Sequence, residues 1–358
     1  MNDFIVVGGG IAGISAAARL SDIGSVTLLE REPALGYHAS GRSAALFEET
    51  YGKPSVIALN RASKAHHQTA HGGVLSPRGL LLVGTPELAD RFDSDVETME
   101  MTRIDMVAAR ALVPILNPDV VDRAAYHPEA WDIDTDRLIQ NFARDLRGNG
   151  GYIVTRAEVT GIRRTATGWA VTTANQTCGA RHLVNAAGAW VDVIANMAGI
   201  APLGFTPYRR SMARIPAPAG HDVSRWPMIF GAGEDWYAKP DAGALIVSPA
   251  EEHLMAPHDA FADDMTLAEG LARYESHVTT PVTRLLASWA GLRTFAPDRQ
   301  LVLGPSPQDP QFIWCAGQGG YGFQTSPAAS QHLADVIAGR PYAIAADHAA
   351  ALDPARFA

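Results

Sequence analysis

The sequence has very few cysteines. Only Cys178 and Cys315 occur among its 358 residues. Two thiols are too few for a disulfide framework, and they lack the Cys/His spacing of a zinc site. We therefore expect two buried thiols, the usual state of free cysteine, and no metal site.

Long apolar runs and an excess of basic residues are also absent. No uninterrupted apolar stretch approaches the roughly 18–20 residues of a membrane span, and no basic leader precedes the first apolar stretch. With 29 Lys and Arg against 38 Asp and Glu, the formal charge of -9 repels phosphate backbones and anionic lipid. These absences predict a cytoplasmic protein with no transmembrane segment and no nucleic-acid partner.

The first 30 residues have the pattern of a βαβ unit. An apolar run (3–7) leads into Gly8-Gly9-Gly10-Ile11-Ala12-Gly13, residues 15–20 read as a helix, and a second apolar strand (25–29) ends at Glu30. In such a turn the first glycine permits the bend, the second admits a pyrophosphate, and the third packs helix on strand. Glu30 is placed to accept hydrogen bonds from ribose hydroxyls. The unit predicts dinucleotide binding, with NAD and FAD both open.

Two features favour FAD. The segment from Gly36 to Ala45 follows Glu30 closely and offers small residues, hydroxyls and Arg42 for a second run of phosphate and ribitol contacts. The turn Ala186-Ala187-Gly188 follows an apolar strand (182–185) and would return the chain to the cofactor. A third apolar strand (312–315) leads into another glycine-rich stretch, residues 316–324.

These separated segments predict an α/β protein of two domains. The first is an FAD-binding Rossmann-like domain of the glutathione-reductase type, formed by residues 1–75, 134–205 and 290–358. The second is an inserted α+β substrate domain on a mixed β-sheet, formed by residues 76–133 and 206–289. Within it, residues 80–83 and 245–247 read as strands and residues 265–279 as a helix.

Taken jointly, the motifs resemble the D-amino-acid oxidase-like superfamily of FAD enzymes, within it the glycine oxidase and D-arginine dehydrogenase branch. The resemblance rests on the two glycine-rich stretches, Gly36 to Ala45, residues 133–136, 184–190 and 208–211, Tyr237-x-Lys239-Pro240, residues 289–293 and residues 318–326. It implies oxidative deamination of a free D-amino acid, by hydride transfer from Cα to flavin N5. The imine product would hydrolyse to a 2-oxo acid and ammonia.

The resemblance also implies non-covalent FAD and an electron acceptor that is either a quinone or oxygen, and it leaves the oligomeric state open. His38 matches a histidine that carries covalent flavin in some relatives, but its Gly36-Tyr37 context is that of the non-covalent ones. The FAD contacts it implies are Gly8, Gly10, Ile11, Ala12, Gly13, Glu30, Arg31, Ala39, Ser40, Gly41, Arg42, Ser43, Ala44, Ala45, Val159, Ala187, Gly188, Trp190, Gly319, Gly320, Tyr321, Gly322, Phe323, Gln324 and Thr325.

Hydride transfer from Cα requires the substrate carboxylate to be fixed with Cα against the flavin, which a bidentate guanidinium does best. Arg210 and Arg293 are the candidates, each expected where a strand of the substrate domain returns toward the flavin. Arg209 is the alternative to Arg210. Tyr51 and Tyr237 match family tyrosines whose hydroxyls reach the same carboxylate or an ordered water.

The glycine-rich stretch near the C-terminus has a second expected task. A helix beginning near Thr325, with Pro327 in its first turn, would direct its positive end at the charge that develops on the reduced flavin. The Gly320 carbonyl is a candidate acceptor for the substrate amine, and Gln324 for a hydrogen bond to flavin or water. No general base is evident.

The resemblance assigns Leu46, Glu48 and Leu80 to the pocket for the substrate side chain. Relatives that prefer arginine and lysine carry a glutamate where this chain has Leu80, and losing a buried charge partner typically costs several kcal/mol. We therefore expect an apolar or small polar substrate. Glu48 either restores a negative charge or faces water.

Three other functions remain open. The first is oxidation of glycine, sarcosine or another N-substituted amino acid. The second is oxidation of a 2-hydroxy acid, which would need a true base that no histidine here matches. The third is a flavin-bearing subunit of a hetero-oligomer, which the burial of two guanidiniums without an anion disfavours. His66, His67 and His71 fall near one helical turn of each other, as metal ligands can, but we expect them to form a solvated helix face.

Overall fold

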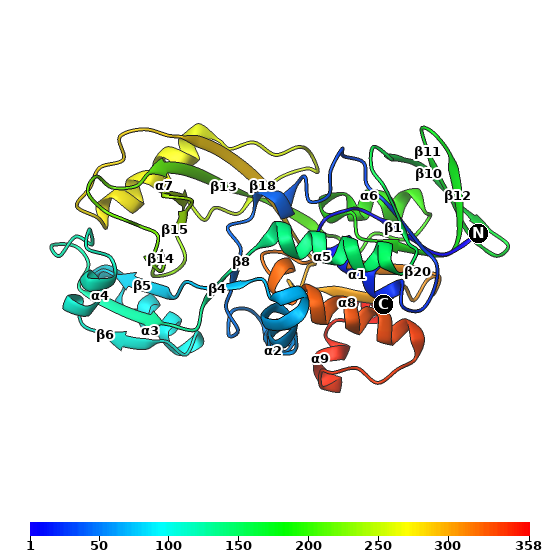
Figure 1. Ribbon diagram of the computed structural model, residues 1–358, viewed down its shortest axis with the longest axis horizontal. Coiled ribbons are helices and arrows are strands. Elements are labelled where there is room, and N and C mark those ends of the chain that lie inside the picture. The colour runs from blue at the N-terminus through cyan, green and yellow to red at the C-terminus, as the bar shows by residue number, and fades with distance from the viewer.

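The computed structural model describes residues 1–358. The chain forms two lobes, each built on a large β-sheet (Figure 1). In the first lobe, β1 (Asn2–Val7) lies in the middle of an eight-stranded sheet and pairs in parallel with β2 (Val26–Leu29) and β12 (Thr177–Asn185). This arrangement confirms the predicted α/β fold.

The remaining strands of the first sheet lie on either side of these three. They are β9 (Tyr152–Val154) next to β2; β11 (Gly168–Thr173) and β10 (Val159–Thr165) on the first half of β12; and β20 (Phe312–Ala316) followed by β19 (Val302–Pro305) on its second half. Parallel strands β2, β1, β12 and β20 therefore end together at one edge of the sheet.

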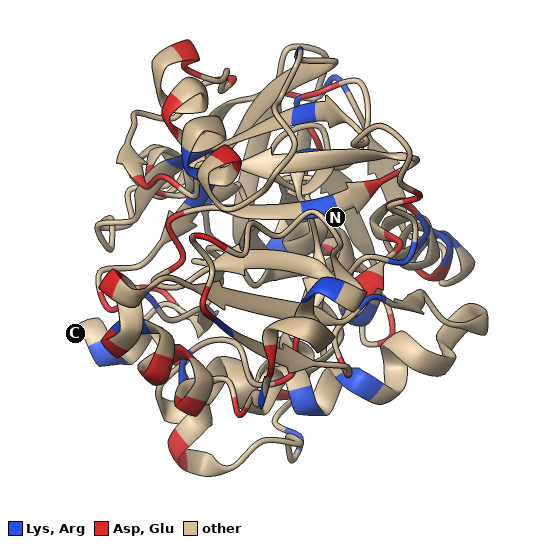
Figure 2. Ribbon diagram, turned by 90° about the vertical axis from the view of Figure 1, so that its left-hand side faces the viewer, with Lys and Arg blue, Asp and Glu red and all other residues tan.

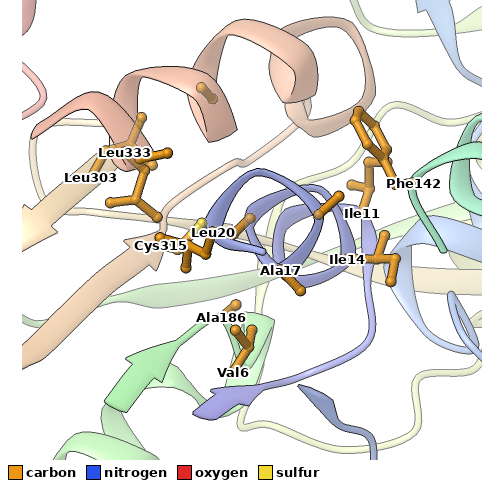
Figure 3. Close-up of a cluster of buried hydrophobic side chains, with 14 of the residues drawn as sticks. Val6, Ile11, Ile14, Ala17, Leu20, Phe142, Ala186, Leu303, Cys315 and Leu333 are labelled. Carbon is orange, nitrogen blue, oxygen red and sulfur yellow. The ribbon is translucent and has the colours of Figure 1, made fainter. Parts of the chain in front are cut away.

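The central helix α1 (Ile11–Leu20) covers one face of this sheet because its apolar residues recur at helical spacing. Ile14, Ala17 and Leu20 are fully buried (Figure 3). They pack in one cluster with Phe142 and Leu333 of neighbouring helices. The first-lobe helices are α2 (Pro54–Thr69), α5 (Thr135–Gly148), α6 (Val191–Met197), α8 (Gly322–Ala338) and α9 (Ala346–Ala350) in addition to α1.

The second lobe contains a nine-stranded mixed sheet. In spatial order its strands are β17 (His253–Leu254), β13 (Thr206–Pro216), β16 (Ala244–Ser248), β15 (Tyr237–Asp241), β14 (Met228–Gly231), β5 (Leu80–Gly84), β7 (Arg123–His127) and β6 (Thr102–Ile104), with β18 (Ala287–Phe295) on the other side of β13. Its helices are α3 (Ala89–Thr98), α4 (Met106–Leu112) and α7 (Asp264–Ser276). The expected strands and helix of this lobe are present.

A separate three-stranded sheet lies between the two lobes. It consists of β3 (Leu46–Phe47), β8 (Trp131–Ile133) and β4 (Leu75–Pro77) and lies where the chain crosses from one lobe to the other.

Two of the predicted domain boundaries fall inside strands. Strand β18 belongs to the second sheet along its whole length, so the boundary proposed at residue 290 lies within it. The boundary at residues 75 and 76 falls inside β4 in the same way. We propose the same division with these two strands kept whole.

Two local expectations were wrong. Helix α8 begins at Gly322, three residues before Thr325, and Pro327 is its sixth residue. A proline there leaves the Phe323 carbonyl without its helical donor, and the Ser326 hydroxyl donates to that carbonyl instead at 3.0 Å. The three histidines do not form a solvated face: His67 is fully buried and His71 lies beyond the end of α2.

Charged residues of both signs are interspersed along the ribbon (Figure 2). Of the two thiols, Cys315 is buried and Cys178 is half-buried. None of the helices is both long and apolar enough to span a bilayer.

Candidate active site

A cavity of about 320 Å³ runs along the edge of the first sheet and reaches into the second lobe. Its lining includes Glu30, Ala157 and Val159 of the first lobe as well as Arg293 and Gly320 beside the second. Its length and its lining by glycine backbone suit an elongated dinucleotide that enters with its pyrophosphate at the first helix.

The glycine-rich turn forms the floor of this cavity. Gly8 has φ of 108°, and a Cβ on it would lie 2.4 Å from the Ala186 carbonyl oxygen, so only glycine fits. Gly13 does not line the cavity; a Cβ there would lie 1.9 Å from the Gly8 carbonyl oxygen. The third glycine therefore sets how closely α1 approaches β1, as its spacing predicts.

Glu30 lies at the end of β2 and is 8% exposed. Its two carboxylate oxygens accept hydrogen bonds from the backbone N–H groups of Gly9, at 2.5 Å, and Glu32, at 2.7 Å. These bonds fix the carboxylate at the wall of the cavity and leave further lone pairs for ribose hydroxyls. Arg31 lies beside it, with its guanidinium 4.2 Å from the centre of the Trp190 ring.

Part of the segment from Ala39 to Ala45 lines the cavity just described, which we call the cofactor cavity. Ala39, Ser40 and Ser43 line the cofactor cavity. Arg42 also lines it, but its guanidinium donates to the carbonyls of Ala260, at 2.8 Å, and Ala290, at 2.9 Å. It also pairs with Asp259. Arg42 therefore attaches the cofactor segment to the second lobe, and its contact with the cofactor phosphates stays a prediction.

Most of the residues expected to contact the cofactor line this cavity. Gly8, Gly10, Ile11, Ala12, Val159, Ala187, Gly188, Trp190, Gly319, Gly320, Gly322 and Phe323 do so along with those already described. Gly13, Gly41, Ala44, Ala45, Tyr321, Gln324 and Thr325 do not line it, and their contact with the cofactor stays a prediction. Gly41 instead donates its N–H to the Gly36 carbonyl, and Thr325 is fully buried.

Arg210 and Arg293 lie side by side where β13 and β18 pair. Arg210 is opposite Gly291, and Arg293 is opposite Tyr208, so the two arginines occupy the same face of the sheet. Both line the cofactor cavity and also a second cavity next to it. Arg209 points to the opposite face, where it bonds His253 at 3.1 Å. This geometry assigns Arg210 rather than Arg209 to the site.

The two guanidiniums have few acidic partners. Arg210 is 7% exposed and donates to the Glu251 carbonyl at 3.0 Å, with the Glu252 carboxylate at 3.4 Å. Burial, followed by the neighbouring Arg293, lowers the pKa of Arg210. For Arg293 burial also disfavours the charge, but Tyr237, Tyr51 and Glu234 outweigh it and raise the pKa. Both remain protonated, and two adjacent positive charges suit a carboxylate.

Tyr51 and Tyr237 complete the same corner. Both line the second cavity, as predicted. The Tyr51 hydroxyl donates to the Glu234 carboxylate at 3.1 Å, and that of Tyr237 lies 3.4 Å from the Met212 sulfur. Burial raises the pKa of Tyr51, so its hydroxyl stays protonated and keeps the hydrogen that it donates to Glu234.

Helix α2 holds the start of α8 in place beside the cavity. The buried His67 imidazole bonds the Gln324 carbonyl through Nε2 at 2.9 Å. Ser63 donates to the Thr325 carbonyl at 3.3 Å and accepts from the Ala328 N–H at 3.1 Å. Gly320 lies two residues before α8, and a Cβ on it would come within 3.1 Å of the Arg293 guanidinium. The backbone therefore passes close to the arginine pair.

The second cavity has a volume of about 110 Å³. The predicted side-chain residues Leu46, Glu48 and Leu80 all line it. The other apolar wall residues are Met99, Met228, Phe230 and Trp236. The cavity therefore combines an arginine pair at one side with a mainly apolar wall and one buried carboxylate, that of Glu48.

Sequence reasoning did not identify several contributors to the site. Glu234 reaches the mouth of the cavity from the turn between β14 and β15, where its φ is 54°. Met99 and Met228 line the wall, and an isolated methionine carries no signal of such a role. Lys239 was noted only as part of a motif. It pairs with Asp132 at 2.7 Å and donates to the Ala44 and Ala45 carbonyls at 3.1 and 3.0 Å.

Comparison with known proteins gives a consistent result. The model of the DAO family, described as FAD dependent oxidoreductase, matches residues 3–336. Dimethylglycine dehydrogenase of Rattus norvegicus is 24% identical over 94% of this chain, which spans 43% of that relative's length. Glycine oxidase of Bacillus licheniformis is 23% identical, covering 95% of this chain and 94% of its own length. The crystal structure of glycine oxidase from Geobacillus kaustophilus matches with a TM-score of 0.81, at 20% identity and 96% coverage of both chains.

Proposed function

The chain belongs to the DAO family of FAD-dependent oxidoreductases, and from that premise we propose that it oxidises the Cα–N bond of a free D-amino acid. The product would be an imine that hydrolyses to a 2-oxo acid and ammonia. Bound FAD supplies the hydride acceptor at N5. The observation that carries the proposal is the pair Arg210 and Arg293, which lie on one sheet face and line both cavities.

The chain's own groups would act by holding the substrate. The two guanidiniums would bind the carboxylate and so fix Cα where the cofactor cavity meets the second cavity, which we call the side-chain cavity from here on. The Tyr51 and Tyr237 hydroxyls line the same corner and would donate to the carboxylate or to a water on it, Tyr51 by turning its hydrogen away from Glu234. Gly320 lies beside Arg293, and its carbonyl would accept a hydrogen from the amine.

The presence of the side-chain cavity favours, as substrate, an amino acid that has a side chain rather than glycine, which has none. Its lining by Leu46, Leu80, Met99 and Phe230 offers apolar contact that glycine would leave unused. Relatives named as glycine oxidase and dimethylglycine dehydrogenase keep glycine and N-methylated amino acids among the compounds to be tested.

Anaerobic mixing tests the proposal. The purified FAD-loaded chain is mixed with D-amino acids, their L enantiomers, glycine, sarcosine and 2-hydroxy acids, and flavin bleaching is followed. We expect bleaching by at least one D-amino acid, faster than by its L enantiomer. Faster bleaching by sarcosine, by an L-amino acid or by a 2-hydroxy acid would contradict the proposal. Bleaching by none of them would favour a flavin-bearing subunit of a larger complex.

A further inference from the structure

The side-chain cavity contains a carboxylate whose hydrogen bonding is incomplete. Glu48 follows directly from β3 and is 3% exposed. Its Oε1 accepts from the Thr50 N–H at 3.1 Å and from the Thr50 hydroxyl at 2.9 Å. Its Oε2 is buried and has no hydrogen-bond partner. An unsatisfied buried carboxylate oxygen costs free energy, so its presence in a ligand cavity calls for an explanation.

The surroundings of Glu48 do not satisfy that oxygen. His127 is an ion-pair partner of this oxygen, but its Nε2 lies 3.5 Å from Oε2, beyond ordinary hydrogen-bond length. The backbone N–H of Glu48 donates to the Gln324 side chain at 3.2 Å, which fixes the residue in place. Burial raises the pKa of this carboxyl, whereas the Thr50 hydrogen bonds and His127 oppose the rise. The group is held rigidly, with one oxygen left for a ligand.

The other groups of the cavity are arranged around a complementary ligand. Arg210 and Arg293 provide positive charge where the substrate carboxylate is proposed to bind. Glu234, bonded to Tyr51 at the mouth, offsets part of that charge. Apolar side chains, including Leu46, Leu80 and Met99, form the rest of the lining. The cavity thus suits a molecule with a carboxylate, an apolar stem and a hydrogen-bond donor.

We propose that Glu48 selects amino acids whose side chain has an apolar stem and ends in a hydrogen-bond donor, either a hydroxyl or an ammonium group. This inference rests on the proposed function and adds the class of side chain to it. Leu80 leaves the opposite wall uncharged, so Glu48 is the acidic group that the cavity offers to the side chain away from the mouth.

Substrates matched in length test the proposal. Norvaline, homoserine and 2,4-diaminobutyrate have side chains of equal heavy-atom number that end in methyl, hydroxyl and ammonium. Norleucine, 5-hydroxynorvaline and ornithine form the same series one methylene longer. With the active enantiomer, kcat/KM should be about tenfold or more higher for a donor-terminated member than for its apolar isostere, the factor expected of a hydrogen bond to a charged group. The order of hydroxyl and ammonium then distinguishes a neutral from a cationic side chain, and either order supports the proposal.

Two variants separate this role from a structural one. Glu48→Gln keeps the size and one acceptor oxygen but presents an amide, so the ratio of kcat/KM for each donor-terminated amino acid to kcat/KM for its apolar isostere should shrink toward unity. Glu49→Gln is the matched control, because Glu49 pairs with Lys64 at 2.8 Å and does not line the cavity. Its donor preference should equal that of the unmodified chain.

Three outcomes overturn the proposal. In the first, the apolar isosteres react as fast as the donor-terminated ones. In the second, Glu48→Gln and Glu49→Gln leave the preference equally unchanged. In the third, none of the six amino acids bleaches the flavin; the proposed function then fails for these substrates, and the inference fails with it. The first two outcomes leave the proposed function intact, because bleaching itself still occurs.

Discussion

Two guanidinium groups distinguish this site from an ordinary nucleotide cleft. Arg210 is almost fully buried, and its nearest carboxylate oxygen, from Glu252, lies 3.4 Å away. Burying such charge without a partner is costly, and a substrate carboxylate would offset that cost. The sign and placement of these two charges therefore favour an anion as the ligand of this site.

Replacing Arg293 by lysine tests the clamp at this scale. Lysine keeps the charge but loses the planar, bidentate geometry, so kcat/KM for the best amino acid should fall by about 100-fold or more. The measurement is steady-state or anaerobic reduction kinetics. The matched control is Arg209→Lys, on the opposite face of β13, which should leave kcat/KM within a few-fold. Equal losses in both variants would contradict the assignment.

Close approach between elements depends on glycines that no larger residue can replace. A Cβ on Gly13 would lie 1.9 Å from the Gly8 carbonyl oxygen. We expect Gly13→Ala to lower the free energy of unfolding by about 3 kcal/mol or more and to weaken FAD binding, because α1 must move away from β1. Urea unfolding and the flavin content of the purified protein measure these effects.

Gly148→Ala is the matched control for that substitution. Gly148 lies at the end of α5, and no atom lies within 4 Å of the position that a Cβ would take there. The alanine should be neutral or slightly stabilising. If Gly13→Ala bound FAD and unfolded like Gly148→Ala, the helix–strand contact would not control the cofactor turn.

The contact between α2 and α8 should give the protein a pH-dependent stability. Burial lowers the pKa of His67 from 6.5 to about 4, more than its hydrogen bond to Gln324 raises it. The unfolded chain therefore binds more protons on this residue than the folded chain between pH 6.5 and about 4. The contribution of His67 to stability is complete above pH 6.5 and declines as the pH falls through this window.

Urea unfolding at several pH values measures this term. When the pH is lowered from about 7 to about 5, the free energy of unfolding should fall by about 2 kcal/mol more for the unmodified chain than for His67→Gln, whose amide side chain cannot be protonated. His221→Gln, at an exposed position, should follow the unmodified chain. If His67→Gln lost as much stability as the unmodified chain, the buried neutral imidazole would not be a source of pH dependence.

How far the elements could be predicted depended on the kind of signal. The first βαβ unit was predictable because the glycine turn, the apolar runs and Glu30 follow one another locally. The start of α8 was not, because Pro327 usually marks a first turn, and only the Ser326 hydroxyl makes it tolerable further in. His67 read as polar surface because nothing local shows that α8 covers it.

The site was predictable to a similar extent. Arg210 and Arg293 followed from chemistry and resemblance, but the choice between Arg209 and Arg210 required the register of β13 with β18. Glu234 could not be foreseen, because it reaches the cavity from a turn and contacts a residue 183 positions away in the sequence. Arg42 was foreseen near the cofactor, but its partners Asp259 and Ala290 are set by tertiary packing.

At the scale of the whole molecule, the cofactor cavity joins the two lobes. It is lined by Gly8 and Glu30 from the first lobe and by Arg210, Met212 and Gly291 from the second. A ligand that bridges two lobes stabilises both together, because it binds only when both are folded. FAD is therefore expected to contribute to the cohesion of the molecule as well as to its chemistry.

Removal of FAD tests this coupling. We expect the FAD-free protein to unfold at a lower temperature, with the second lobe losing its tertiary structure ahead of the first, and re-addition of FAD to restore a single transition at the higher temperature. Differential scanning calorimetry with near-UV circular dichroism follows both lobes. Identical melting with and without bound FAD would show that the cavity does not couple them.

The most direct test of the arginine clamp compares substrates with and without the carboxylate. The FAD-loaded chain is mixed anaerobically with its best amino acid and with the amino alcohol and the amide that correspond to it. The clamp predicts rapid flavin bleaching by the amino acid alone, and slow bleaching of Arg293→Lys by that same amino acid. Equal bleaching by the amino alcohol or the amide would show that Arg210 and Arg293 do not hold the substrate.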